Sequence, residues 1–317
     1  MLFLRKAIII QLFFDVYSKQ EGVLMDTEKC RALLCVLETG SLSAAAEQLG
    51  YTPSGVSRMM AALEEEVGFP LLERGRGGVE ATAACRLLLP AVREMAGAGQ
   101  RFREAAASIR GVELGSVCVG SAYGAYYARL AETVAAFSAE HPGIDVQILQ
   151  GSSSSLCVAL ERHEVDFAIV SRREGEFSFL PLLRDPMMVW LPEGHPLAAH
   201  ASVPIESFET APYIATYPEQ DTDNDRILRA HAIQPKTRFA TIDDRATAAL
   251  VRAGLGISMN NGILGDVLDL SGIAVRPLAP ETIVEIGAAL PPESRRSPAA
   301  KAFLRTAEQT GLIYYVN

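Results

Sequence analysis

Residues 41–74 read SLSAAAEQLGYTPSGVSRMMAALEEEVGFPLLER. A glycine follows each amphipathic segment and can take the left-handed conformation that ends a helix. Thr52 is a suitable N-cap, and Pro53 fits the first helical position because its missing N–H would have no partner there. The sequence therefore predicts a short helix over Ser43–Leu49, capped by Ser41 or Ser43, then a sharp turn and a second helix that starts at Thr52.

The second helix has two different faces. Its apolar residues Val56, Met60, Leu63 and Val67 are spaced by four, three and four positions, which places them on one inward stripe. The opposite face is small, polar and singly basic, and it consists of Pro53, Ser54, Ser57, Arg58 and Ala61. Two short helices with such an outer face are typical of the helix-turn-helix that enters a DNA major groove, where Arg pairs with guanine. A simple capped helical hairpin has the same spacing, so spacing alone leaves both interpretations open.

A glycine-rich hairpin is expected after the second helix. The segment Phe69–Arg74 suits a short strand, Gly75–Gly78 a tight turn, and Val79 begins the returning strand. Arg74 and Arg76 would lie at this turn, where guanidinium groups can contact phosphates or a minor groove. The hairpin is either a DNA-binding wing or an ordinary glycine-rich hairpin.

Three motifs follow one another along the chain: GSLSAAAEQLG (40–50), SGVSR (54–58) and GFPLLER (68–74). Together with their surroundings from Met25 to Thr82 they resemble the DNA-binding domain of LysR-type transcriptional regulators. The resemblance implies a winged helix-turn-helix that binds promoter DNA. The candidate DNA-binding residues are Ser43, Thr52, Pro53, Ser54, Ser57, Arg58, Arg74 and Arg76.

The chain departs from the family pattern in three places. The family usually has Gln where Pro53 stands, Phe where Leu72 stands, and a Leu-Thr-x-x-Gly run at residues 81–85. The missing Gln removes an amide that could read adenine. We therefore expect the operator sequence, rather than the DNA-binding role, to differ from that of relatives.

The charge is unevenly distributed along the chain. The net charge is −9, with 10 basic and 11 acidic residues in 25–110 but 16 basic and 25 acidic residues in 111–317. The N-terminal part can thus present a cationic surface to phosphates although the whole chain is acidic, and a solvated charged face would have the same composition.

The five cysteines form no CxxC motif and have no nearby His, which gives no support for a zinc site or a disulfide framework. We expect a cytoplasmic protein with no metal and no cofactor.

The first 24 residues carry an apolar run after Arg5 and Lys6, but no small-residue cleavage site follows it. The run is also shorter than the roughly 20 apolar residues that span a membrane. Back-translation of Gln20–Gly22 permits a purine-rich ribosome-binding sequence. We therefore expect Met25 to be the native start and residues 1–24 to be an extension that is not native.

A long helix is predicted from Thr82 to Arg110. Apolar and small residues recur in heptad spacing at Leu88, Val92, Met95, Gly99, Phe102, Ala106 and Ile109. So narrow a stripe suits pairing with another helix, although packing on the same chain remains open. In the family this segment is the linker helix of a dimer, which implies a homodimer or homotetramer.

After Ser116, β-rich stretches alternate with helical patterns, which predicts parallel sheets. The pattern is similar to the family's effector domain, which has two α/β subdomains joined by crossover strands, as in periplasmic binding proteins. The expected fold class is therefore α/β. The expected divisions are an extension (1–24), a winged helix-turn-helix (25–83), a linker helix (84–110), subdomain 1 (111–185 with 284–317) and subdomain 2 (186–283).

The family's effector domain binds a small molecule between its subdomains, where strand ends and helix N-termini meet. The serine run 151–155 offers hydroxyls and backbone N–H groups, which favours a carboxylate or other anion as the effector. An N-cap followed by a loop would have the same composition. The candidate effector-binding residues are Ser121, Tyr123, Ser152, Ser153, Ser171, Thr216 and Asn260.

Other functions find less support in the sequence. No GxSxG or HExxH motif occurs, the histidines lie in charged or Pro-containing stretches, and Asp221–Asp225 lacks the Gly and Glu of a calcium loop. A peroxide sensor of the same family would need paired cysteines in subdomain 2, and none follows Cys157. The sequence thus predicts a transcription regulator and not an enzyme. The alternative is a solute-binding protein or small-molecule enzyme with an incidental helical N-terminus.

Overall fold

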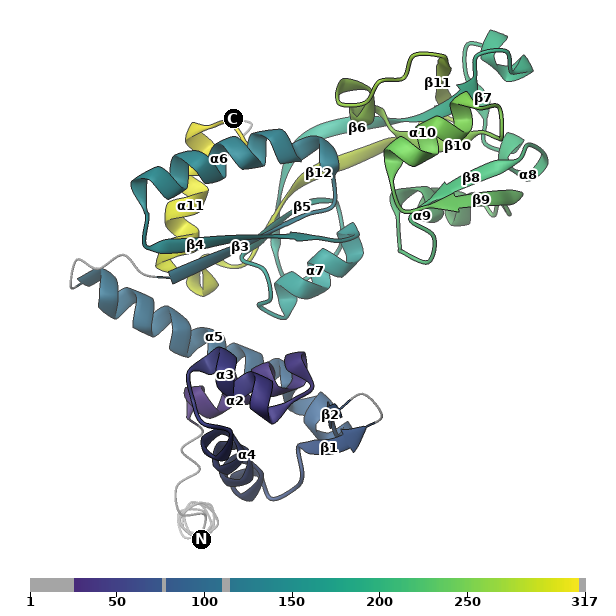
Figure 1. Cartoon of the computed structure of the whole chain (residues 1–317). Coiled ribbons are helices and arrows are strands. Elements are labelled where there is room, and N and C mark those ends of the chain that lie inside the picture. Colours follow the sequence, from purple (N-terminus) through teal and green to yellow (C-terminus); the bar gives the residue numbers. More distant parts are fainter. Residues whose placement is uncertain (1–25, 76–77, 110–114, 314–317) are drawn as a thin grey trace, which may run out of the picture. The chain divides into compact units, whose positions relative to one another are not determined.

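The computed structural model describes residues 26–75, 78–109 and 115–313. It divides into two compact units, which meet in the chain at Phe102 and Arg103 and are described separately (Figure 1). The expectation for residues 1–24 and the position of Arg76 lie outside the described residues. Among the helices that are described, none has the length and apolar character needed to cross a membrane.

The first unit begins with three short helices, α2 (Thr27–Thr39), α3 (Leu42–Leu49) and α4 (Pro53–Val67). Gly40, Gly50 and Gly68 end them in the left-handed conformation, with φ of 64°, 72° and 83°. Thr52 caps α4 as predicted, and its Oγ1 accepts from the Gly55 N–H at 3.1 Å. Of the two candidate caps of α3, Ser41 is the one observed, since its hydroxyl accepts from the Ala44 N–H.

The wing consists of β1 (Leu72–Gly75) and β2 (Gly78–Ala81), an antiparallel pair in which Gly75 faces Gly78. Glu64 near the end of α4 anchors its first strand, because one carboxylate oxygen accepts from the Leu71 and Leu72 N–H groups at 2.7 and 3.0 Å. A Cβ on Gly78 would lie 2.4 Å from the Gly40 carbonyl oxygen. The second strand therefore requires glycine at this close approach, where φ is also +125°.

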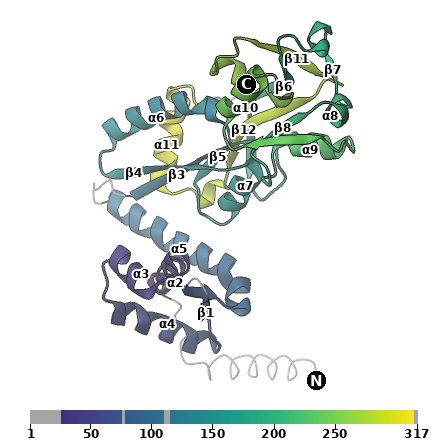
Figure 2. The same cartoon turned by 45° about the vertical axis from the view of Figure 1, so that its right-hand side comes forward.

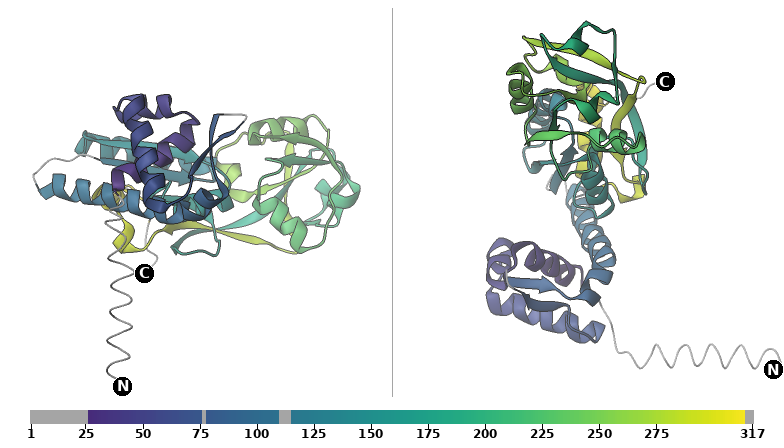
Figure 3. Two further views of the ribbon diagram at one scale, coloured as in Figure 1. Left: turned by 90° about the horizontal axis from the view of Figure 1, so that it is seen from below. Right: turned by 90° about the vertical axis from the view of Figure 1, so that its right-hand side faces the viewer.

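The helix α5 (Ala83–Ile109) is one long element that begins beside the wing (Figure 3). Most of its predicted heptad seam packs within its own unit. Val92 is 2% exposed and belongs to the core formed with Leu33, Val56 and Leu63, and Leu88 and Met95 pack against that core. A Cβ on Gly99 would lie 2.6 Å from Cβ of Thr27. From Leu88 to Gly99 the stripe packs on the helix-turn-helix, which is the same-chain packing that the heptad spacing left open.

Two large apolar side chains of α5 remain uncovered. Leu87 is 83% exposed and Phe102 is 75% exposed. Ala91 and Ala98 lie between them and are also exposed. Since these four positions are spaced by four, seven and four residues, they share one face of the helix, which we call the outer stripe.

The second unit starts with a parallel sheet of β3 (Gly115–Ser121), β4 (Ile144–Gln150) and β5 (Phe167–Ser171) in the order β4-β3-β5. The helices α6 (Tyr127–Glu140) and α11 (Pro298–Gln309) cover one face of it, and α7 (Ser153–Glu161) covers the other (Figure 1, Figure 2). Val117 and Val119 pack under the first pair, whereas Ala168 and Val170 pack under α7. This three-layer arrangement places the ends of the strands next to the N-terminus of α7.

A long strand, β6 (Ser178–Pro192), links the two halves of this unit. Residues 178–186 of this strand pair with β12 (Ile283–Leu290). Its second part pairs on one side with β10 (Ser258–Asn261), from Met187 on, and on the other with β11 (Ile273–Ala279), over its last five residues. The chain returns through β11 and β12. Two antiparallel connections therefore join subdomain 1 to subdomain 2, as the resemblance implies.

Subdomain 2 holds the parallel pair β8 (Tyr213–Thr216) and β9 (Thr237–Thr241), with β7 (Val203–Pro204), α8 (Ser207–Thr210), α9 (Asp223–Ala230) and α10 (Asp244–Arg252). Short 3₁₀ helices span Gly124–Tyr126, Pro196–Ala199, Gly262–Asp266 and Glu293–Arg295. The apolar stretch 255–258 has the composition of a strand, but β10 begins only at Ser258. The reason is that Gly256 packs against the Pro212 carbonyl, where a Cβ would lie 2.4 Å away, so the ladder with β6 starts after this crossing.

Candidate functional site

The outer face of α4 is formed as the periodicity predicts. Thr52, Pro53, Ser54, Ser57 and Arg58 are exposed, whereas the inward side chains Val56 and Leu63 are fully buried. The Arg58 Nε lies 3.4 Å from the Ser54 carbonyl oxygen, and no acidic partner of Arg58 occurs among the described residues. A small, polar face with one cation is thus presented on a helix that its own core holds in place.

The remaining candidates of the first unit differ in how they are placed. Ser43 is exposed on α3 and does not cap it. The Thr52 hydroxyl is already used as the cap of α4 and lies 3.2 Å from the Ser54 hydroxyl. The backbone of Arg74 lies in β1, but its side chain lies outside the described residues, as does all of Arg76.

The second unit contains a cavity of about 410 Å³ between its two subdomains. Five of the seven predicted effector-binding residues line it, namely Tyr123, Ser152, Ser153, Thr216 and Asn260. Tyr123 follows β3, Ser152 caps α7 and Ser153 begins it, Thr216 ends β8, and Asn260 lies in β10. The ends of strands and the N-termini of helices therefore meet at this cavity, which has the size of a small-molecule site.

The other two predicted residues, Ser121 and Ser171, do not line the cavity. Both are buried, and the Ser121 hydroxyl donates to the Tyr123 carbonyl oxygen at 3.1 Å. The Ser171 hydroxyl donates to Asp223 Oδ1 at 2.6 Å and lies 3.0 Å from the Ser153 hydroxyl. These serines lie behind the lining residues and hold them in position, because strand ends point their alternate side chains into the core.

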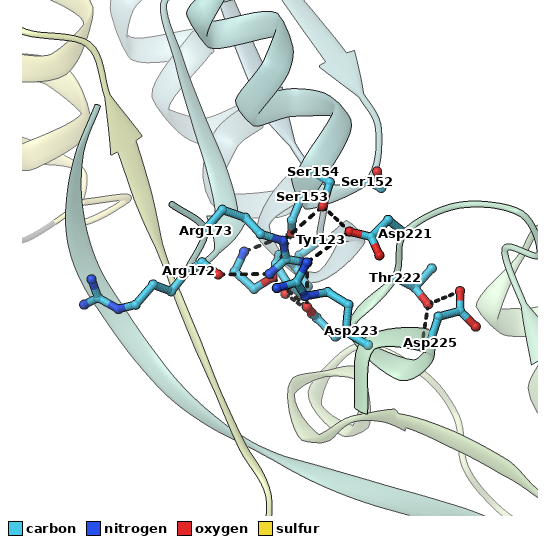
Figure 4. A network of polar contacts seen from close by, with 12 residues as sticks. Tyr123, Ser152, Ser153, Ser154, Arg172, Arg173, Asp221, Thr222, Asp223 and Asp225 are labelled. Atoms are coloured by element: carbon cyan, nitrogen blue, oxygen red, sulfur yellow. Dashed lines mark hydrogen bonds and ion pairs between the residues drawn. The ribbon is translucent and has the colours of Figure 1, made fainter. Parts of the chain in front are cut away.

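A buried ion pair joins the two subdomains beside the cavity (Figure 4). Arg173 follows β5, and its Nη2 lies 3.0 Å from Oδ1 of Asp223, the first residue of α9. Their side chains are only 9% and 10% exposed. The Tyr123 hydroxyl also donates to Asp223, so this carboxylate has three partners from subdomain 1 (Figure 4).

A second carboxylate, Asp221, lies close to the N-terminus of α7. It accepts from the Ser154 hydroxyl at 2.5 Å and from the exposed Arg226 and Arg229. These donors hold the pKa of Asp221 below its usual value. Sequence reasoning missed Arg173, Asp221 and Asp223, since the only local signal is an acidic run around the cap Thr222, which is common at helix starts.

Burial changes the ionisation of several groups at the cavity. Burial, followed by the charge of Asp223, raises the pKa of Tyr123, so this phenol keeps its proton and donates it. Burial and the neighbouring Asp243 raise the pKa of Asp244 to about 6. Asp244 is the first residue of α10 and receives a hydrogen bond from Tyr217.

The lining is acidic. Asp221, Asp223 and Asp244 line the cavity together with hydroxyl and amide groups, and no Lys, Arg or His lines it among the described residues. No group of three or more His, Cys, Asp or Glu residues in the described part of the chain is arranged to hold a metal ion. A carboxylate or other anion, as the serine run suggests, would lie near these carboxylates, and like charges repel at short distance in a poorly solvated site.

Family comparisons match both units. Residues 27–86 match the model "Bacterial regulatory helix-turn-helix protein, lysR family", and residues 110–311 match "LysR substrate binding domain". The HTH-type transcriptional regulator YvbU of Bacillus subtilis (strain 168) is 24% identical over 289 residues, which cover 90% of this chain and 98% of that protein.

Solved structures share the fold. A full-length OxyR variant from Pseudomonas aeruginosa superimposes with a TM-score of 0.70 at 20% identity, covering 92% of this chain and 97% of that one. Full-length CbnR, a LysR family transcriptional regulator solved with its target DNA, superimposes with a TM-score of 0.55 at 19% identity, covering 90% and 99%. These findings do not favour a solute-binding protein or an enzyme.

Since the second family model alone covers more than half of the chain, and the first covers the helix-turn-helix, this chain belongs to the LysR family of DNA-binding transcriptional regulators.

Proposed function

We propose that this regulator recognises its promoter DNA through Ser43 on α3 and through Thr52, Pro53, Ser54, Ser57 and Arg58 on α4, with Arg74 and Arg76 of the wing on the adjacent backbone. The observation that carries this proposal is the outer face of α4, which is exposed while its inner stripe is buried. Arg58 supplies the one cation on that face and can pair with a guanine. In this proposal Thr52 acts mainly through its cap.

The proposal is tested by the affinity of the full chain for its own upstream DNA. Arg58→Gln is expected to weaken specific binding by about 1–3 kcal/mol, or roughly tenfold to a hundredfold, because one bidentate base contact is lost. Fluorescence anisotropy at several salt concentrations measures this, since phosphate contacts alone make binding fall steeply with salt.

Lys301→Gln provides the matched control. It removes the same single charge from an exposed position on α11, in the other unit, and should leave the affinity unchanged. Equal affinity of the unmutated protein for unrelated DNA would contradict specific recognition.

We further propose that the chain forms a homodimer, or a tetramer built from such dimers, through the outer stripe of α5. Leu87 and Phe102 are too exposed to contribute to their own core, and burying each against a second copy would remove about 1.5–3 kcal/mol of unfavourable apolar exposure. The heptad residues from Leu88 to Gly99 instead hold α5 on the helix-turn-helix. Two paired chains would present two recognition helices to half-sites about one DNA turn apart.

Charged residues on the outer stripe should separate the chains. The double variant Leu87→Asp/Phe102→Asp is expected to lower the mass measured by light scattering to that of a monomer while the melting temperature of the first unit stays the same. Leu88→Ala should instead lower the melting temperature of the first unit and leave the mass unchanged, because Leu88 packs against the core of that unit. An unchanged mass for the double variant would exclude this face as the interface.

The cavity between the subdomains is proposed as the effector site, and its occupancy is proposed to control DNA binding. We keep the domain boundaries proposed from the sequence, with the linker helix at 84–110 and subdomain 2 at 186–283. The protein would act in the cytoplasm, where its promoter lies. Tyr123, Ser152, Ser153, Thr216 and Asn260 would contact the effector, while Ser121 and Ser171 would support them.

A further inference from the structure

The three carboxylates of the cavity differ in their partners. Asp223 is paired with Arg173, and Asp221 with Arg226 and Arg229. Asp244 also lines the cavity, but no ion pair to it occurs among the described residues. The groups around it are Asp243, which is the N-cap of the same helix, and Tyr217 after β8, whose own pKa is raised mainly by burial and also by the nearby Tyr127 of α6. The cavity therefore contains one carboxylate for which the described residues supply no cationic side chain.

The helix ends at the cavity do not offer a place for an anion. The first turns of α9 and α10 carry the acidic residues Asp223 and Asp244, which already interact with the positive ends of these helices. The N-terminus of α7 faces Asp221 through Ser154 and Asp223 through Ser171 and Ser153. Arg173 also donates to Ser154 there, but it is already paired with Asp223, so an anion would find no free cation among the described lining residues.

A metal ion does not account for the acidic lining either. The described carboxylates of the cavity form no group of three that could coordinate one. Hydroxyl and amide side chains such as Thr216, Gln220 and Asn224 line the cavity together with the carboxylates. An organic molecule with several hydrogen-bonding groups suits this lining better than a bare ion.

Asn260 provides an independent indication of a bound polar molecule. It lines the cavity and is 2% exposed, and its Nδ2 has no hydrogen-bond partner among the described residues. A buried amide without a partner costs free energy, and it is satisfied when a ligand supplies an oxygen acceptor. The ligand therefore needs an acceptor near Asn260 as well as a positive charge near Asp244.

We infer that the effector is an organic cation, a protonated amine that also carries hydroxyl or carbonyl oxygens, with the amine paired to Asp244 and an oxygen accepting from Asn260. This inference rests on the proposed effector site and names the chemical class of its ligand. Asp244, the lining carboxylate without a described ion pair, would repel an anionic analogue of the same shape.

The test uses three probes that share one ring and differ in charge: D-glucosamine, D-glucose and D-glucuronate. Binding to the full chain at pH 7.0, where most of the glucosamine carries a protonated amine, is measured by calorimetry and by ligand-detected NMR. The amine is expected to bind most tightly, the neutral sugar at least about tenfold more weakly, and the carboxylate most weakly, because a hydrogen bond to a charged group is worth roughly twice a neutral one.

Two variants test whether Asp244 causes the preference for glucosamine over glucose. Asp244→Asn should remove the advantage of glucosamine over glucose, whereas Asp145→Asn, the same change at an exposed position on β4, should preserve it. In the unmutated protein the advantage should also decline as the pH falls from 7 through about 6, where Asp244 becomes protonated and loses its charge. The ranking on the unmutated protein stands independently of whether Asp244→Asn folds, which circular dichroism checks.

Three outcomes would overturn the inference: tightest binding by glucuronate, equal binding by all three probes, or no binding of glucosamine at 50 mM, roughly the upper limit for a weak site. An advantage of glucosamine that survives Asp244→Asn would also overturn it. Loss of specific promoter binding by the same unmutated sample would instead contradict the proposed function. The two failures are distinguishable because the probe experiment contains no DNA.

Discussion

At the residue scale, Ser41 and Ser43 show how two equivalent sequence signals acquire different roles. Both precede or begin the same helix, and both are residue types that cap well. Only the Ser41 hydroxyl accepts from the α3 backbone, at the Ala44 N–H, and Ser43 remains exposed. The cap thus lies two residues before the serine that is proposed to contact DNA.

We expect Ser41→Ala to lower the free energy of unfolding of the first unit by about 1 kcal/mol, because the Ala44 N–H loses its acceptor. Ser43→Ala should change it by less than about 0.5 kcal/mol, since an exposed hydroxyl contributes little. Urea denaturation followed by circular dichroism measures both. A larger cost for Ser43→Ala than for Ser41→Ala would contradict the assignment of the cap.

At the scale of elements, α5 carries two stripes that the heptad pattern did not separate. The predicted stripe from Leu88 to Gly99 packs on the first unit, and the outer stripe with Leu87 and Phe102 is exposed. The two stripes are adjacent in sequence, because neighbouring residues of a helix lie about 100° apart. Periodicity identifies the helix but leaves open which partner covers which face.

Two glycines of α5 test the packing of the predicted stripe. Gly97→Ala should raise stability by about 0.5–1 kcal/mol, because its Cβ would meet only the flexible end of Arg101 and alanine favours a helix. Gly99→Ala should lower it by about 1–3 kcal/mol, because its Cβ would overlap Thr27. Thermal denaturation of the two variants side by side decides this, and a stabilising Gly99→Ala would show that α5 is not held against α2.

At the scale of the whole molecule, the second unit depends on contacts between residues far apart in the sequence. Arg173 and Asp223 join its two subdomains across 50 positions, in a place with little solvent. The adjacent Arg172 pairs instead with Glu285, and those side chains are 51% and 38% exposed. The neighbouring arginines therefore offer a matched comparison of a buried and an exposed ion pair.

Arg173→Gln is expected to destabilise the second unit by about 3 kcal/mol or more, because it leaves Asp223 buried without its counter-ion. Arg172→Gln should cost no more than about 1–2 kcal/mol, from a solvated ion pair and the contact of its guanidinium with the Phe179 ring. Chemical denaturation monitored at Trp190, which is buried in subdomain 2, reports on this unit. Equal costs for both variants would exclude a special role for the buried pair.

Local features of this protein were predictable from the sequence because they depend on neighbouring residues. Backbone preferences and the ends of predicted strands gave the caps and ends of α3 and α4, the inner stripe of α4, and five residues that line the cavity, out of seven predicted. Tertiary structure alone decided that Leu88 to Gly99 pack on their own unit and that Asp221, Asp223 and Asp244 make the cavity acidic. The physical reason is that burial, ion pairing and the sign of the charge in a cavity depend on which distant residues the fold brings together, and no local pattern records that choice.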